Sequence, residues 1–296
     1  MTRRAVPLLL FVAVVASGCG ARSEPLGPLA QEYPVRVEGA GDRAAVLTAP
    51  AKRIVVLDPG SAELLAAIGA GERLVGVPTG LDEELPDAAR VVRSTGQVSV
   101  EEVIRLEPDL IVATPAVDQV DVGRVERESG AVTYLQPASS VDEVVRGVIE
   151  LGFLSSRSAP ARALAGSIRK EVRRVEARVA EAAAVPVFID TGFLFTIPER
   201  SLAGDLVRRA RGQSVAGPNP GPEPFQTCEV ARLEPAVLLL VVESGSAAGS
   251  PSFRDCPGGA DIRVERIPAD LVLRPGPRLG EALEAVARAL HPDAFG

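Results

Sequence analysis

The chain has 296 residues, 46% of them hydrophobic and 24% charged, which is typical of a folded globular protein and argues against a disordered chain. Its 32 basic and 39 acidic residues give a net charge of −7, so a nucleic-acid-binding surface, which needs an excess of positive charge, is not expected. The single histidine, His291, argues against a metal site built from histidines and against any mechanism that needs two of them.

Residues 1–18 have the pattern of an export signal, because two arginines precede a short apolar run that ends in small residues. Cys19 follows directly, and the segment resembles a bacterial lipoprotein signal, with Ala16 where that pattern usually has leucine. The resemblance implies cleavage before Cys19 and acylation of this cysteine, whereas an ordinary cleaved signal with an incidental cysteine is the alternative. Residues 19–34 are rich in Gly, Pro, Ser and Glu and are expected to form a flexible tether.

From 35 to 156, short apolar runs alternate with amphipathic segments, which predicts an N-terminal α/β lobe with parallel strands. Ser61 is expected to cap the first helix of this lobe. The expected strands are 54–57, 74–77, 110–113 and 132–135, and the expected helices are 61–68, 100–106 and 141–154.

A long connecting helix is expected over 157–184, where apolar residues recur at helical spacing: Leu164, Ile168, Val172, Val175 and Val179. Alternation of strands and helices then restarts at Val187, so 185–296 is expected to be a C-terminal α/β lobe.

The two lobes share a repeat. Residues 101–108 and 228–235 are identical at most positions, lie 127 residues apart, and each block ends in proline before an apolar strand. One helix–proline–strand unit in each half suggests two related lobes, although coincidence among common helix residues is the alternative.

Several sequence blocks, given at the end of this paragraph, follow one another in the same order as in the substrate-binding lipoproteins of bacterial ABC importers. They resemble the iron–siderophore/cobalamin class of these proteins. The resemblance implies two Rossmann-like α/β lobes joined by a single long α-helix, with a ligand cleft between the lobes. It also implies a monomer that works with an ABC permease and its ATPase. The blocks are 50–71, 74–77, 100–112, 188–192, 228–240 and 274–278.

The resemblance further implies an exposed glutamate at the tip of each lobe that pairs with an arginine of the permease. Glu101 stands at this place in the first block, but Cys228 occupies the equivalent place in the second, where the adjacent Glu229 is the candidate. Two solvated carboxylates favoured by the helix dipole are the alternative interpretation.

The loops that follow the strands are expected to line the cleft, because ligands of open α/β sheets bind beyond the carboxyl ends of the strands. Exposed rings there could pack against a macrocycle, and arginines could bind carboxylate, hydroxamate or catecholate oxygens. Arg274, which precedes Pro-Gly-Pro, is the strongest candidate. The aromatic candidates are Phe193, Phe195 and Phe225, and the other arginine candidates are Arg278, Arg93 and Arg200.

Outside the cytosol, Cys228 and Cys256 are expected to form a disulfide, because they are a pair in an oxidising compartment and do not form a C-x-x-C motif.

Residues 212–216 nearly match a nucleophile elbow around Ser214, but Ala216 replaces the last glycine, and His291 is the only histidine that could act as base. We therefore expect no enzyme, no catalytic residue, no metal site and no cofactor.

The expected function is that of a receptor anchored by lipid to the outer face of the cytoplasmic membrane or to the periplasmic side of the envelope. It would deliver a metal chelate, such as a ferric siderophore, to the permease. A corrinoid or haem receptor of the same class is the alternative. Further alternatives are an envelope scaffold without a small ligand, a metal-ion receptor, and a secreted hydrolase.

Overall fold

The computed structural model describes residues 31–296 except 82, 219, 222 and 244–248. Cys19 and the expected signal peptide lie outside the described residues. Residues 31–296 form one compact unit, which is the body described below. No helix within the described part of the chain is long and apolar enough to cross a membrane.

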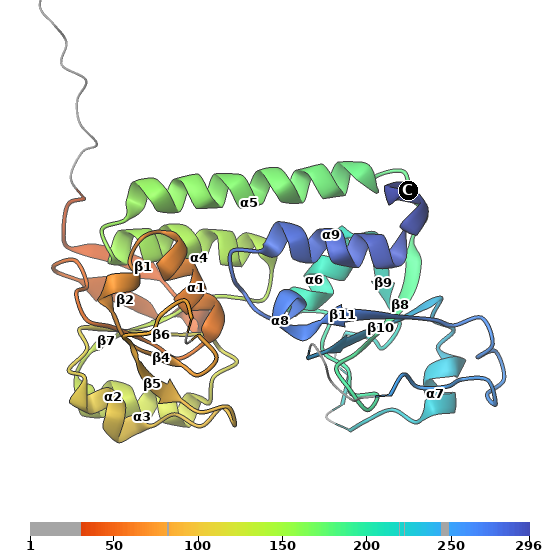
Figure 1. Cartoon of the computed structure of the whole chain (residues 1–296), viewed down its shortest axis with the longest axis horizontal. Helices are drawn as coiled ribbons and strands as arrows, with labels where there is room; N and C mark the ends of the chain where they lie inside the picture. The colour runs from red at the N-terminus through yellow and green to blue at the C-terminus, as the bar shows by residue number, and fades with distance from the viewer. Residues whose placement is uncertain (1–30, 82, 219, 222, 244–248) are drawn as a thin grey trace, which may run out of the picture. The chain divides into compact units, whose positions relative to one another are not determined.

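The first lobe is built on a five-stranded parallel sheet in the order β5-β4-β3-β6-β7 (Figure 1). A small antiparallel hairpin precedes it. The hairpin consists of β1 (Val35–Glu38) and β2 (Ala44–Leu47). The sheet strands are β3 (Ile54–Val56), β4 (Leu74–Pro78), β5 (Ala89–Val92), β6 (Leu110–Ala113) and β7 (Val132–Leu135). The helices are α1 (Pro59–Ala67), α2 (Val100–Arg105), α3 (Gln119–Ser129) and α4 (Val141–Leu154).

The second lobe is built on a four-stranded parallel sheet in the order β11-β10-β8-β9. Its strands are β8 (Val185–Asp190), β9 (Gly212–Ser214), β10 (Val237–Val242) and β11 (Arg263–Pro268). Its helices are α6 (Leu202–Arg209), α7 (Thr227–Arg232), α8 (Ala269–Val272) and α9 (Leu279–Leu290). Two lobes with parallel sheets confirm the expected fold class.

The connecting helix is α5 (Ser158–Arg178), which ends before the expected boundary at residue 184. Val179, whose amide N–H still bonds to the carbonyl of Val175, is 1% exposed and packs into the core, and the chain then turns toward β8. Val179 thus continues the buried stripe of α5 as its C-cap residue, four positions after Val175. Leu164, expected in the buried stripe, is only partly buried, and Ala161 and Ala165 complete the stripe instead.

Each sheet separates two layers of core. The alternation of strands sends Ile54 and Val56 into a core shared with α4, α5 and the second lobe, while Val55 faces the outer layer with α2 and α3. In the second lobe, Ile189 joins the shared core and Phe188 faces the outer layer beside α7. The lobes are thus joined by a continuous apolar core and by α5.

The first helix begins earlier than the sequence suggests. Asp58, and not Ser61, is the N-cap of α1, since its Oδ1 accepts the Ser61 amide at 2.8 Å while Pro59 occupies the first turn. The Ser61 hydroxyl instead donates to Gln136 Oε1 at 3.1 Å.

The chain enters the body beside the start of α5. The hydroxyl of Tyr33 donates to the carbonyl of Phe153 at 2.7 Å, and the Ser158 hydroxyl lies 2.8 Å from Gln31 Oε1. Residues 31–34, expected in the tether, therefore contact the first lobe, because the partly buried ring of Tyr33 packs against the core.

Candidate functional site

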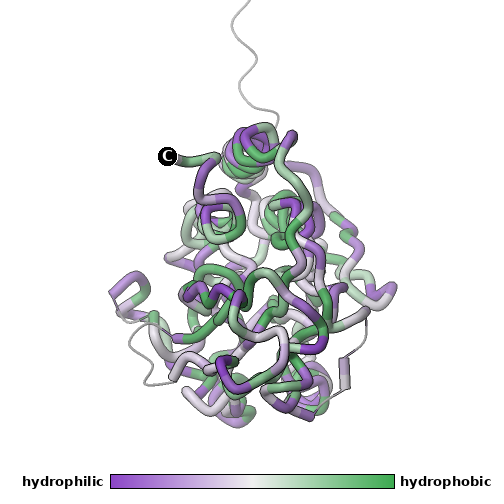
Figure 2. Tube along the Cα trace, turned by 90° about the vertical axis from the view of Figure 1, so that its right-hand side faces the viewer, coloured by the Kyte–Doolittle hydropathy of each residue, from purple (hydrophilic) through white to green (hydrophobic). Residues whose placement is uncertain are grey.

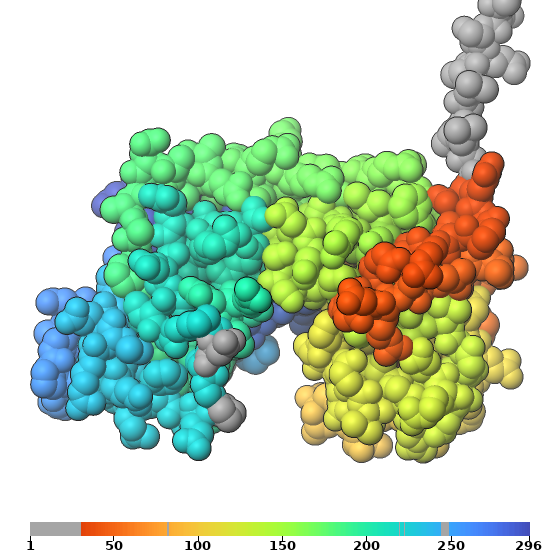
Figure 3. Space-filling model, turned by 180° about the vertical axis from the view of Figure 1, so that it is seen from behind, coloured from red at the N-terminus to blue at the C-terminus, as the bar shows by residue number. Residues whose placement is uncertain are grey.

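The carboxyl ends of strands from both lobes line two adjoining pockets. One pocket, of about 230 Å³, lies between Asp58 and Thr114 of the first lobe and Arg274 of the second. The other, of about 250 Å³, shares Thr114, Leu273 and Pro275 with it and extends toward Arg200. Figure 3 shows that the surface is hollowed between the two lobes. We refer to these two pockets as the cleft.

A third pocket, of about 610 Å³, continues past Arg200 over α6 and β9. Although it is larger, it runs mainly along α6, β9 and the start of α4, and its wall includes Asp205 and Arg208, which already pair with each other. The cleft is therefore the better candidate for a ligand site.

The lobes touch at the edge of the cleft through two glycines. A Cβ atom on Gly60 would lie 2.9 Å from the backbone of Pro275, and one on Gly276 would lie 2.7 Å from Glu63 Oε2. Both distances are too short for real Cβ contacts. At Gly60 the neighbour is backbone, so this approach of α1 to the loop 274–276 requires glycine there, whereas at Gly276 the end of the Glu63 side chain would have to move.

Arg274 reaches across this contact. Its Nη1 lies 2.5 Å from Glu63 Oε1, and the two side chains are 28% and 16% exposed. The strongest arginine candidate thus lines the cleft as expected, but its charge is already paired. Glu63 was missed by the sequence analysis because it sits in an ordinary helical position, and only the fold places it opposite Arg274.

Asp58 is a second cleft residue, and it belongs to the loop after the first strand, one of the loops that the sequence predicts to line the cleft. It is 6% exposed, and burial raises its pKa to about 6 although Ser61 and Arg274 act against this shift. Oδ1 accepts the Ser61 amide, whereas Oδ2 has no hydrogen-bond partner within the described part of the chain.

The other candidate arginines differ in their surroundings. Arg278 pairs with Asp270 at 3.0 Å. Arg200 lines the cleft and has no acidic partner among the residues that the structure describes. Arg93 is exposed in the turn after β5 and does not line either pocket of the cleft. Of the four candidate arginines, only Arg200 therefore offers the cleft a charge without an acidic partner among the described residues.

The three aromatic candidates also differ in their surroundings. Phe193 is 83% exposed and Phe195 41% exposed in the loop after β8. Phe225 packs edge-on against Phe188, with ring centroids 5.2 Å apart, in the outer core of the second lobe. The structure therefore uses Phe225 for packing and leaves Phe193 and Phe195 exposed, but neither of these two rings lines the pockets of the cleft.

Exposed apolar side chains collect where strands end. Among the described residues, the large hydrophobic side chains that are exposed are those of Val46, Val120, Phe193, Phe195 and Leu273. All except Val46 follow a strand end of one of the two sheets, and Leu273 lines both pockets of the cleft. Exposed apolar groups around a concave surface are typical of a ligand site.

The two expected docking residues lie on α2 and α7, at the end of each lobe away from α5 (Figure 1). The Glu101 side chain is 72% exposed and lies 3.0 Å from Arg124. Its own backbone amide and the Arg124 guanidinium hold the pKa of Glu101 below its usual value. Glu229 accepts the Gln226 amide at 3.2 Å and so caps its own helix.

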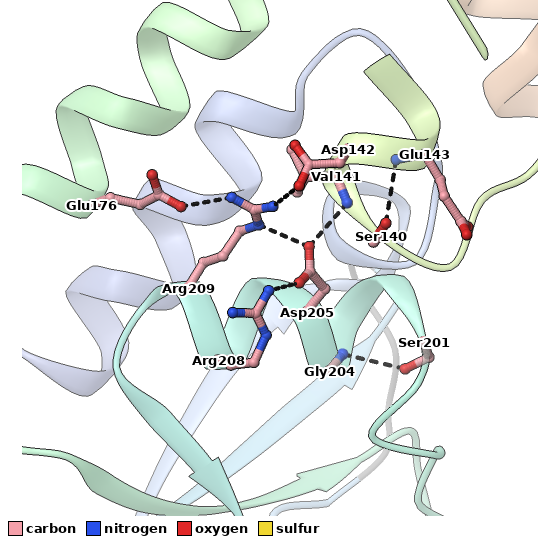
Figure 4. Close-up of polar contacts among 10 residues, drawn as sticks. All are labelled: Ser140, Val141, Asp142, Glu143, Glu176, Ser201, Gly204, Asp205, Arg208 and Arg209. Carbon is pink, nitrogen blue, oxygen red and sulfur yellow. Dashed lines mark hydrogen bonds and ion pairs between the residues drawn. The ribbon is translucent and has the colours of Figure 1, made fainter. Parts of the chain in front are cut away.

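A cluster of charges joins the lobes near α5, as Figure 4 shows. Arg209 of α6 contacts Asp205 at 2.8 Å, Asp142 of α4 at 2.6 Å and Glu176 of α5 at 2.7 Å. Asp205 also accepts the backbone amide of Val141 at 3.0 Å. Burial opposes the charge on Asp205, but its bonds to Arg209, Val141 and Arg208 lower its pKa overall.

Cys228 and Cys256 are joined by a disulfide, with Cα atoms 5.1 Å apart. Ser214 lies in β9, and the ring of His291 contacts the carbonyl of Ala210 at 2.9 Å, where it ends α9. Among the described residues, no group of three His, Cys, Asp or Glu side chains could hold a metal ion.

Residues 54–232 match a family described as periplasmic binding protein. This chain belongs to that family. It is 25% identical, over 97% of its own length and 96% of the relative's, to the uncharacterized ABC transporter substrate-binding lipoprotein YvrC of Bacillus subtilis. It is 28% identical to the cobalamin-binding protein of Halobacterium salinarum, over 88% of this chain and 74% of the relative.

Solved structures of the same fold include the periplasmic vitamin B12-binding protein of Vibrio cholerae. Its TM-score is 0.72 at 21% identity, and the match covers 83% of this chain and 98% of that chain. The periplasmic heme-binding protein RhuT from Roseiflexus sp. RS-1 has a TM-score of 0.69 at 20% identity, covering 82% and 99% of the two chains. As a member of this family, the chain is an extracytoplasmic solute-binding protein of the ABC importer type.

Proposed function

We propose that this protein binds a corrinoid in its cleft and delivers it to an ABC permease and its ATPase. The observation that carries the choice of ligand is the pairing of Arg274, which lines the cleft, and of Arg278, which lies four residues further along the chain. Arg274 and Arg278 are neutralised by Glu63 and Asp270, so they do not offer free charge to an anionic chelate. Asp58 adds a buried carboxyl group.

A neutral macrocycle with amide side chains suits such a cleft. Its flat face can pack against Leu273, and its amides can bond to polar groups such as the hydroxyl of Thr114, since both residues line the cleft. The names of several relatives agree with this choice, since they are a cobalamin-binding protein and vitamin B12-binding proteins.

A ligand with one or two carboxylates is the second candidate, because Arg200 lines the cleft without an acidic partner among the described residues. Haem is such a ligand, and proteins of the same fold include heme-binding proteins. A ferric siderophore with several anionic groups would need more free positive charge than Arg200 supplies.

A thermal-shift screen of the receptor against cyanocobalamin, haem and ferric siderophores tests this proposal. A ligand that binds only the native state at a concentration of about 100 times its Kd stabilises it by about 2.7 kcal/mol, which raises the Tm. We expect the largest rise with cyanocobalamin. A rise with ferric catecholates alone would overturn the choice of ligand, and no rise with any of them would favour an envelope scaffold.

The receptor is further proposed to act by binding alone, as a monomer, and to be held at the membrane by a lipid on Cys19. Cys19→Ser should release it from membranes or block its processing. If the Cys19→Ser variant has the normal mature mass and is retained at the membrane as the wild type is, lipidation is contradicted.

Glu101 is the proposed contact for the permease. Glu229 is a weaker candidate, since its carboxylate already caps α7.

A further inference from the structure

The outward face of α5 is positively charged along its whole length. Twelve residues of this helix are exposed, six of them are arginine or lysine, and none is acidic. The others are alanine, glycine, proline or serine. We call this surface the α5 face, and its charged members are Arg162, Arg169, Lys170, Arg173, Arg174 and Arg178.

The net charge of α5 is opposite in sign to that of the rest of the chain. The six basic and two acidic residues of α5 give the helix a net charge of +4, while the whole chain carries −7, so the remainder carries −11. The two acidic residues of the helix have partners other than the basic residues of the α5 face. Glu176 contacts Arg209 at 2.7 Å, and Glu171 lies 3.3 Å from the Ser167 hydroxyl.

Neighbouring helices neutralise only one end of the face. Glu284 of α9 contacts Arg174 at 2.9 Å and also Arg288 at 2.7 Å. Arg178 lies over the ring of Phe295, 5.0 Å from its centre. Arg162, Arg169, Lys170 and Arg173 have no acidic partner within the described part of the chain.

The chain that leads to Cys19 leaves the body at the same place. Gln31 bonds to Ser158, the first residue of α5. The twelve residues from Cys19 to Gln31 can span at most about 40 Å, and α5 itself is roughly 32 Å long. A lipid on Cys19 would therefore hold this end of α5 close to the bilayer. In Figure 2, which views the body from one side, α5 lies at one extreme of the body.

We propose that the α5 face binds the anionic phospholipid surface of the membrane to which the receptor is anchored. Clustered arginine and lysine side chains are attracted to anionic lipid within about a Debye length, and small residues between them let the helix approach the headgroups closely. This inference rests on the proposed lipid anchor, which supplies the membrane and the nearness of the helix to it.

The consequence concerns transport. The helices α2 and α7, which carry Glu101 and Glu229, lie at the opposite end of the body from α5 (Figure 1). A receptor that rests on its α5 face therefore points its proposed docking tips away from the bilayer, into the medium. Delivery to a permease requires that it leave this surface and turn over.

The two lysines of the chain supply a direct measurement. Lys170 belongs to the α5 face, whereas Lys52 is exposed on the first lobe outside it. The full-length processed receptor is mixed with excess vesicles of phosphatidylcholine, or of equal parts phosphatidylcholine and phosphatidylglycerol. Acetylation of each lysine by an amine-reactive ester is then measured by mass spectrometry, and Lys52 serves as the internal standard.

We expect the ratio of Lys170 to Lys52 acetylation to fall by about fivefold on anionic vesicles at low salt, to recover at high salt, and to stay unchanged on neutral vesicles. The triple change Arg162→Gln, Arg169→Gln and Arg173→Gln should abolish the protection. Arg127→Gln, Arg232→Gln and Arg254→Gln together remove the same charge from exposed positions elsewhere and should preserve it.

Equal ratios on the two kinds of vesicle, or protection that survives the α5 triple change, would overturn the inference. Flotation with neutral vesicles measures the lipid anchor separately, since the α5 face contributes nothing there. The ratio of Lys170 to Lys52 acetylation is measured with excess lipid, so it does not require the anchor. Loss of the lipid anchor and loss of lipid binding by the α5 face therefore give different results. Ligand titration of the triple variant should match the wild type.

Discussion

Glu63 of α1 and Arg274, which follows α8, form an ion pair at 2.5 Å although they are 211 positions apart in the chain. The pair joins the two lobes at the edge of the cleft, where Gly60 and Gly276 allow the backbones to approach. Together with α5 and the Asp205 cluster, it fixes the separation of the lobes. The cleft is therefore largely formed before a ligand arrives, which lowers the ordering cost of binding.

Removing this ion pair should loosen the edge of the cleft. For Glu63→Gln and Arg274→Gln, a double-mutant cycle in urea denaturation should give a coupling energy of about 1 kcal/mol, because the pair is partly buried. Hydrogen exchange should also speed up in α1 and in residues 273–276. The pair of Arg278 and Asp270 lies within one lobe and serves as control. Equal exchange in both variants would contradict a role in joining the lobes.

Asp58 should make stability depend on pH. Its pKa is about 6 in the folded protein and about 3.9 when unfolded, so the folded state holds the proton more tightly. The associated stability is fully present below about pH 4 and is lost as pH rises through 6. Asp58→Asn keeps a capping oxygen, and its stability relative to wild type should rise by roughly 1–3 kcal/mol between pH 4 and pH 7.

The measurement is urea denaturation at both pH values. Asp118 caps α3 from an exposed position, so Asp118→Asn is the matched control. A stability difference for Asp58→Asn that is the same at pH 4 and pH 7 would show that the carboxyl group is not perturbed.

Arg209 should be the most sensitive member of the charge cluster between the lobes. Arg209→Met leaves Asp205, which is 8% exposed, without its main partner, and should lower the free energy of unfolding by about 2–4 kcal/mol. Arg208→Gln removes a partner that is 69% exposed and should cost less than about 1 kcal/mol. If Arg209→Met and Arg208→Gln lowered the free energy of unfolding by similar amounts, the burial of Asp205 and its partner would not determine the size of the loss.

Glu101→Gln should weaken association with the permease and slow uptake in reconstituted vesicles, most strongly at low salt, while leaving ligand affinity unchanged. Glu128→Gln is a close control, because Glu128 also pairs with Arg124 and is exposed on the neighbouring helix. If Glu101→Gln altered ligand affinity and not uptake at saturating ligand, its assignment to docking would be wrong.

The disulfide closes a loop of 28 residues in the second lobe. Its loss in the double variant Cys228→Ser and Cys256→Ser should lower the free energy of unfolding by about 3–4 kcal/mol in the chain-entropy description. Wild type treated with a reductant should show the same loss. Free, alkylatable thiols in protein taken directly from the envelope would contradict the bond.

The fold could be anticipated from the sequence because strand length, proline positions and the repeat are local signals. The strand 110–113 and helix 141–154 lie where they were expected. The start of α1 and the end of α5 differ. The start depends on the choice between two capping side chains, and the end comes six residues before the expected boundary although no proline or glycine marks it.

The cleft was less predictable. Its arginines and aromatic residues could be named from their loops, but the sequence does not show that Glu63 neutralises Arg274 or that Phe225 packs against Phe188. These contacts join residues that are distant in sequence or lie in different loops. Only three-dimensional packing decides which candidates remain free for a ligand.

Calorimetric titration of the receptor with cyanocobalamin tests the central claim most directly, when it is combined with a change inside the cleft. Leu273 and Val46 are exposed to nearly the same extent, 42% and 43%, but only Leu273 lines the cleft. Leu273→Arg should abolish binding or weaken it at least about tenfold, while Val46→Arg should leave 1:1 binding intact. Absence of binding by the wild type, or equal binding by both variants, would contradict a corrinoid site between the lobes.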